Sequence, residues 1–167
     1  MLPPQYNQSK KGSPMNTHNL VRLIIRDKQK ILLAQATKKN GTKFFFLPGG
    51  HIEYNESMDK AAKRELGEEI NIAPERVTGI SLLGVFEHSW DDNGSPYHEL
   101  SFICSCKIDD LSSDRTIDSA ESHLSFEWVD IEQLPHVNFL PNQFAIELSK
   151  WLLKSEKNEA LFFSTIN

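Results

Sequence analysis

The sequence has few cysteines, no long apolar run and no excess of basic residues, and each shortage excludes a class of protein. Only two of its 167 residues are cysteines, Cys104 and Cys106, which is too few for a structural zinc site. Two residues apart on a strand, they share a face but are badly spaced for a disulfide. We therefore expect reduced thiols in a cytoplasmic protein.

Membrane and secretory proteins are disfavoured for a related reason. No apolar run approaches the roughly 20 residues that a membrane helix needs. Residues 1–17 contain no apolar stretch of the kind found in a secretory signal. We therefore expect no membrane partner.

The charge balance argues against a nucleic-acid-binding protein. Lys and Arg total 18 and Asp and Glu total 23, for a formal net charge of −5. Binding to the backbone of DNA or RNA rewards clustered Lys and Arg, so we expect a small-molecule partner instead. The length suits one domain with a real core. A homodimer is compatible with this sequence, but no feature shows one.

Apolar alternation and turn residues predict one α/β domain with a mixed sheet. Residues 1–17 read as a disordered leader, 18–155 as the domain and 156–167 as a C-terminal tail. The Asp-Asp-Asn-Gly run at 91–94 predicts a hairpin, and we expect the apolar tail Leu161–Phe163 to dock on the protein's own surface, with a partner site as the alternative. The predicted strands are 20–25, 31–36, 44–47, 80–88, 97–108 and 126–131, and the predicted helices are 57–70 and 142–154.

The first predicted helix carries a cluster of carboxylates. Glu65, Glu68 and Glu69 stand at i, i+3 and i+4, so their side chains share one face. That face lies beside the apolar stripe of Ala62, Leu66 and Ile70, where the edge of a cleft would be. The few nearby cations cannot neutralise this cluster, whereas Mg²⁺ or Mn²⁺, which prefer oxygen ligands, can. The alternative for a Glu-rich helix is a solvated face.

The spacing around this cluster resembles the Nudix box, G-x₅-E-x₇-R-E-U-x-E-E-x-G-U, where U is a bulky aliphatic residue. The matching residues are Gly50, Glu56, Arg64, Glu65, Leu66, Glu68, Glu69 and Ile72. Asn71 stands where the family has Gly, and Asn also adopts the left-handed conformation that ends a helix. The segments 47–50 and 128–134 also look like the family, so the resemblance covers about residues 19–154.

The resemblance implies a Nudix-type α/β/α sandwich and metal-dependent hydrolysis of a nucleoside diphosphate linked to another moiety. It implies that Glu65, Glu68 and Glu69 bind the metal and that Gly49 adds a backbone carbonyl. Arg64 would hold the carboxylates in position, and Glu56 would support the loop. The general base in this family often lies on a loop before the last sheet strand. Glu121 is our candidate there, with Glu99 and Glu127 as rivals.

The substrate stays open, because the marks of the ADP-ribose, dinucleoside polyphosphate and NADH subgroups are absent. Trp90 and Tyr97 on the predicted hairpin offer flat faces for a base, and packing of the hairpin is the alternative. His51 follows Gly50 directly and is our candidate for orienting a phosphate. A non-hydrolysing nucleotide sensor on the same fold is the second hypothesis, and an isomerase variant is the third.

Overall fold

The computed structural model describes residues 16–92, 95–154 and 160–166, without the side chains of residues 16, 90–92 and 95. Two helices and two short 3-10 helices, Pro74–Arg76 and Ile131–His136, accompany the strands in this part of the chain. The helices are α1 (Met58–Ile70) and α2 (Asn142–Leu153). The strands are β1 (Asn16–Asp27), β2 (Lys30–Thr37), β3 (Lys43–Phe46), β4 (Val77–Asp92), β5 (Ser95–Ile108), β6 (Leu124–Asp130) and β7 (Leu161–Ser164).

The strands form a mixed sheet in the order β3-β2-β1-β5-β4-β7, with β6 paired to β2. β1 runs parallel to β5 and β7 parallel to β4, whereas β2 is antiparallel to β1, β3 and β6. β4 and β5 form a long antiparallel hairpin, in which Asp91 is paired with Pro96. The predicted hairpin is confirmed, although residues 93–94 at its tip lie outside the described part.

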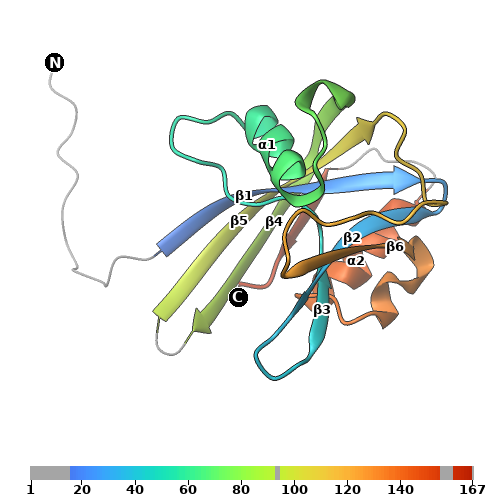
Figure 1. The fold of residues 1–167 in the computed structure, drawn as a ribbon. Coiled ribbons are helices and arrows are strands. Elements are labelled where there is room, and N and C mark those ends of the chain that lie inside the picture. The colour runs from blue at the N-terminus through green and yellow to red at the C-terminus, as the bar shows by residue number, and fades with distance from the viewer. Residues whose placement is uncertain (1–15, 93–94, 155–159, 167) are drawn as a thin grey trace, which may run out of the picture.

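Each face of the sheet packs against one helix (Figure 1). On β1, Leu23 belongs to the core cluster that contains Ala62 and Leu66 of α1, whereas its neighbour Ile24 belongs to the cluster that contains Leu148 of α2. Because successive side chains of a strand point to opposite faces, the two helices cover opposite faces of the sheet. The predicted α/β/α sandwich with a mixed sheet is confirmed.

Local sequence fixes the ends of α1. The Ser57 hydroxyl accepts a hydrogen bond from the Lys60 N–H at 3.3 Å, which makes Ser57 the N-cap. Asn71 ends the helix in the left-handed conformation, with φ at 54°. Both features agree with the predicted ends of this helix, so the substitution of Asn for Gly in the box leaves its geometry intact.

Several predicted strands are too short. β1 begins at Asn16, inside the predicted leader. Its first residues pair with β5 of the long hairpin, and Asn16 lies opposite Tyr97. The rest of the predicted leader, residues 1–15, lies outside the described part. The predicted tail contributes β7, which docks on the edge of β4. Both cysteines are buried and free. No helix among the described residues has the length and apolar character needed to cross a membrane.

Candidate active site

The three carboxylates of α1 have different surroundings. Glu69 lies against the core and is only 5% exposed, Glu65 is half-buried and Glu68 is exposed. The Gly49 N–H donates a hydrogen bond of 3.0 Å to Glu69 Oε2. Burial raises the pKa of Glu69 to about 8, although the Gly49 hydrogen bond and Arg22 oppose this effect, and the nearby Glu65 and Glu121 add to it. Glu69 is therefore a buried carboxyl that holds its proton near neutral pH.

Arg64 holds the loop before α1 and two of the helix carboxylates together. Its guanidinium binds both carboxyl oxygens of Glu56, at 2.9 and 3.0 Å. It also contacts Glu65 at 2.8 Å and Glu68 at 3.2 Å, and donates to the His51 carbonyl at 2.8 Å. The bond from Arg64 lowers the pKa of Glu56 to about 2. The positioning role that the resemblance implied for Arg64 therefore has a direct geometric basis.

Gly50 lets the loop before α1 pack closely against Glu65. A Cβ at residue 50 would collide with the carboxyl group of Glu65. Burial raises the pKa of Glu65, and the bond from Arg64 opposes that rise. The glycine of the box thus allows the loop backbone to lie directly against a carboxylate.

Sequence reasoning missed Arg22, a half-buried residue of β1. Its guanidinium donates to the carbonyls of Leu47, at 3.3 Å, and Gly49, at 2.5 Å. It also lies over the ring of Phe46, 5.4 Å from the centroid. The available signal was a single charge inside the apolar run of residues 20–25. The partners of that charge depend on the strand register, which the sequence does not show.

The loop before β6 lies next to Glu69. The Ala120 N–H donates to the Glu69 carbonyl at 2.8 Å, and Glu121 is close enough to raise the pKa of the Glu69 carboxyl. Glu121 also pairs with His123 at 3.4 Å. Of the two rivals, Glu99 accepts a hydrogen bond from Ser101, and Glu127 is exposed on β6. Of the three candidates, Glu121 is the one whose charge acts on the Glu69 carboxyl.

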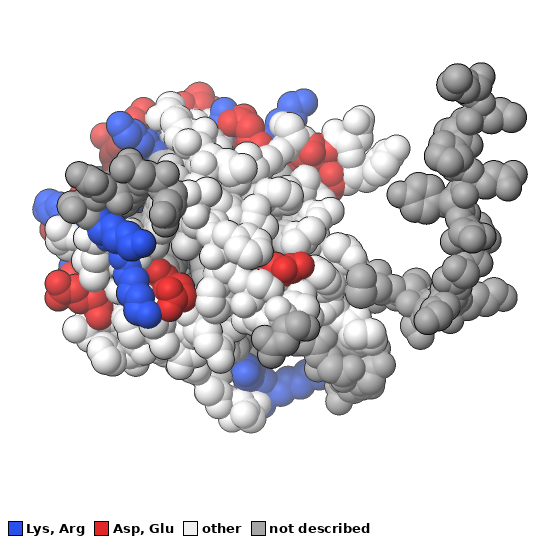
Figure 2. Space-filling model, turned by 180° about the vertical axis from the view of Figure 1, so that it is seen from behind, with Lys and Arg blue, Asp and Glu red and all other residues white. Residues whose placement is uncertain are grey.

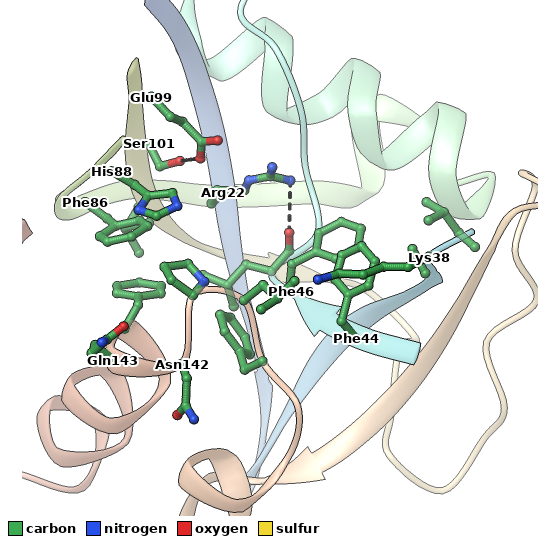
Figure 3. A pocket seen from close by; sticks show the side chains of 18 of the residues that line it. Arg22, Lys38, Phe44, Phe46, Phe86, His88, Glu99, Ser101, Asn142 and Gln143 are labelled. Carbon is green, nitrogen blue, oxygen red and sulfur yellow. Dashed lines mark hydrogen bonds between the residues drawn. The ribbon is translucent and has the colours of Figure 1, made fainter. Parts of the chain in front are cut away.

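A cavity of about 790 Å³ opens beside Arg22 (Figure 3). Its polar lining includes Lys38, Glu99, His123, Asn142 and Gln143. Figure 3 shows the Arg22 guanidinium between the carboxylate of Glu99 and the aromatic rings of β3, with its bond to a backbone carbonyl drawn as a dashed line. The aromatic lining consists of Phe44, Phe46, Phe86, Phe139 and Phe144.

On the side of the molecule that Figure 2 shows, charged side chains lie mainly toward the edges. A broad central area there carries few Lys, Arg, Asp or Glu atoms.

Two of the three residues predicted to bind substrate do not line this cavity. His51 and Tyr97 are not among the residues that line it. The His51 ring instead contacts His18, with Nε2 and Nδ1 2.8 Å apart, and the Tyr97 ring lies 5.4 Å from His18. Trp90 belongs to β4, but its side chain lies outside the described part. The aromatic rings around the cavity come from β3, β4 and the segment 139–144, which sequence reasoning had not brought together.

The carboxylates of α1 have the right chemistry for a hard divalent cation, since all three donors are oxygen atoms on one helix face. Within residues 16–92, 95–154 and 160–166, however, no three acidic, histidine or cysteine side chains are already arranged to hold a metal ion. Arg64 engages Glu65 and Glu68, and the Gly49 carbonyl accepts a bond from Arg22. A cation that binds these groups therefore competes with two arginines.

The α/β/α sandwich and the three carboxylates of α1 together indicate a class of protein. Comparison with known families identifies that class. The NUDIX domain model matches residues 16–152. The chain belongs to the Nudix hydrolase family, and the prediction of an enzyme of the Nudix pyrophosphohydrolase class is confirmed at this level.

Individual relatives are distant. The ADP-ribose pyrophosphatase of Methanocaldococcus jannaschii is 28% identical over 128 residues, which are 77% of this chain and 70% of that protein. A Caenorhabditis elegans protein that carries the name nudix hydrolase 1 is 28% identical over 108 residues, 65% of this chain, and the chain spans only 26% of that protein's length.

Solved structures of the family share the fold. The MutT NUDIX hydrolase of Burkholderia pseudomallei superposes with a TM-score of 0.62 at 20% identity, over 80% of this chain and 98% of that one. The NUDIX hydrolase of Nitrosomonas europaea gives a TM-score of 0.61 at 20% identity, over 86% of this chain and all of the other.

Proposed function

We propose that this protein hydrolyses the pyrophosphate bond of a nucleoside diphosphate linked to another moiety, such as a nucleotide, a nucleotide sugar or a dinucleotide. One observation carries the proposal. Arg22 lines the cavity, and it also donates to the carbonyl of Gly49, whose N–H binds Glu69. A molecule that fills the cavity would therefore extend directly toward the carboxylates of α1.

The cavity suits the nucleoside end of such a substrate. Its volume of about 790 Å³ falls in the usual range for small-molecule sites. Its phenylalanine rings offer faces for a base, and stacking on an aromatic ring is worth about 1–3 kcal/mol per base. The amides of Asn142 and Gln143 supply donors and acceptors at the same wall. The M. jannaschii relative is named for a substrate of this chemical class.

The carboxylates suit the other end. Glu65, Glu68 and Glu69 would hold a divalent cation, Mg²⁺ or Mn²⁺, with the Gly49 carbonyl as a further oxygen donor. When bound, such a cation screens the phosphate charges, lowers the pKa of water and stabilises the leaving oxygen. Glu121 lies beside Glu69 and is our candidate for the group that accepts the proton from the attacking water. Arg64 fixes Glu56, Glu65 and Glu68, and His51 stays a proposed phosphate contact.

One observation favours the second candidate, a nucleotide-binding module without turnover. Arg64 already pairs with Glu65 and Glu68, so the carboxylates have a protein partner without any cation. The two candidates differ in a simple respect, because the module would bind nucleotides and leave them intact.

A substrate screen tests the proposal. Nucleoside triphosphates, nucleotide sugars, ADP-ribose and dinucleoside polyphosphates are incubated with the protein and Mg²⁺ or Mn²⁺, and the phosphate-containing products are separated and identified. We expect cleavage within the pyrophosphate of at least one class. The variant Glu121→Gln should reduce this turnover at least about tenfold, whereas the matched control Glu127→Gln, at an exposed position of β6, should not. Binding of a nucleotide without any cleavage would favour the sensor instead.

A further inference from the structure

The C-terminal strand β7 lies beyond the residues that match the family model, which ends at residue 152. It adds to the sheet as a parallel edge strand, with Leu161 opposite Gly84 and Phe163 opposite Phe86. Gly84 permits this close approach, because a Cβ there would collide with the Leu161 carbonyl. The chain therefore contains a glycine at the position where its own last strand has to dock.

Phe163 packs against two aromatic rings of the cavity wall without lining the cavity itself. Its ring stacks on Phe86 with centroids 5.7 Å apart, and it lies 6.3 Å from the ring of Phe144. Phe86 and Phe144 stack on each other at 4.4 Å, and both line the cavity, whereas Phe163 does not. Replacing Phe163 would therefore loosen two lining rings without removing any atom from the cavity wall.

Thr165, one residue after β7, fixes a polar member of the same wall. Its N–H donates to the Glu87 carbonyl at 3.0 Å. Its hydroxyl lies 2.7 Å from Nδ1 of His88, which lines the cavity. Burial lowers the pKa of His88, although Glu99 opposes the effect, so the ring enters the cavity wall mainly uncharged. A neutral imidazole has one donor and one acceptor, and its orientation decides what it offers a ligand.

We propose that the C-terminal segment 161–165 determines how the cavity binds its nucleoside, with Phe163 and Thr165 as positioning residues for Phe86, Phe144 and His88. This inference rests on the proposed function, because it takes the cavity as the nucleoside site. Phe162 supplies an internal contrast. It lies between Leu161 and Phe163 on the same strand, but its side chain is 70% exposed and points away from the face that carries Phe163.

Binding and kinetics of matched variants test the inference. The affinities of AMP, GMP, CMP and UMP are measured by calorimetry, and KM and kcat are measured on the best substrate of the screen. Phe163→Leu and Thr165→Val should each weaken the preferred nucleoside monophosphate and raise KM roughly fivefold, with kcat within about twofold, because they disturb binding alone. Thr165→Ser, which keeps the hydroxyl, should have the monophosphate affinity and the KM of the wild-type protein. Phe162→Leu is the matched control and should change neither.

The outcomes separate the inference from the proposed function. Weaker monophosphate binding in Phe163→Leu and Thr165→Val supports the inference even if the wild-type protein cleaves no nucleotide, in which case only the hydrolase proposal fails. Normal turnover with unchanged affinity and KM in both variants would overturn the inference and leave the hydrolase intact. Melting curves show whether each variant is still folded. A purely structural role of the replaced residue would lower the Tm and leave the affinity of the folded protein unchanged. If no monophosphate binds the wild-type protein at millimolar concentration, the cavity is not a nucleoside site and the inference is wrong.

Discussion

The replacement of Glu69 by Gln should stabilise the metal-free protein, and the gain should depend on pH. Glu69 is buried, and its pKa is raised from 4.5 to about 8. Because the folded protein holds this proton more tightly than the unfolded chain, the contribution of Glu69 to stability falls as the pH rises from 4.5 to 8. Gln fills the same space, carries no charge and keeps an oxygen that can accept the Gly49 N–H.

The size of the gain follows from the shift. One pKa unit corresponds to about 1.4 kcal/mol, so the full shift sets an upper limit of roughly 5 kcal/mol on the cost of ionising Glu69 in the folded state. Relaxation of the site around the charge reduces this cost, and we expect a gain on the order of 2 kcal/mol near pH 8. For a chain of this length, that corresponds to an increase in Tm of roughly 4–8 °C. Near pH 5, Glu69 in the folded protein is mostly uncharged, like the Gln that replaces it. The gain in stability should therefore shrink to less than about 1 kcal/mol.

Urea unfolding and thermal melts in excess chelator, at both pH values, measure the effect. The exposed Glu127→Gln serves as the control and should behave as wild type at each pH. A variant that is less stable than wild type near pH 8, or a gain of equal size at both pH values, would refute the reasoning. Either result would mean that the Glu69 carboxylate has a stabilising structural partner.

Three further changes probe the rest of the site. Arg64→Lys keeps the charge but loses the two-pronged bond to Glu56, so steady-state kinetics should show at least about a tenfold lower kcat, and an unchanged kcat would contradict the clamp. Mg²⁺ binding should release close to one proton near pH 7, because Glu69 is then mainly protonated; calorimetry in two buffers of different ionisation enthalpy measures the proton, and its absence would exclude Glu69 as a ligand. Trp90→Ala tests whether the hairpin also contacts the substrate: if it does, KM should rise several-fold with kcat nearly unchanged, while a lower Tm with the same KM would assign Trp90 to packing of the hairpin and leave base binding to the cavity.

The local features of the site could be predicted from the sequence, because they depend on residues close together in the chain. The shared face of Glu65, Glu68 and Glu69 follows from helical geometry alone. Ser57 and Asn71 end α1 where the capping preferences place them. The cluster was predicted beside the apolar stripe, and Glu69 does lie against the core.

The long-range features could not be predicted in this way. Arg22 meets Gly49 only because β1 lies beside the loop that precedes α1. The rings of the cavity come from separate elements, and a sequence pattern cannot show which faces of them meet. Base recognition was predicted on the hairpin because aromatic residues are close together there in the chain, and that pattern could not show that the Tyr97 ring lies 5.4 Å from His18. β7 was expected to dock, but the edge it pairs with depends on Gly84, and no local signal links the two.

The most direct test of the central claim is the turnover of the best nucleotide substrate with Mg²⁺, compared with the same reaction in excess chelator. The carboxylates of α1 are proposed to act through a bound cation, so the account predicts that chelator abolishes product formation and that restored Mg²⁺ recovers it. Glu68→Gln, at an exposed position where we expect the fold to be kept, should lower kcat at least about 10²-fold in Mg²⁺. Full activity in excess chelator, or wild-type turnover by Glu68→Gln, would contradict the account.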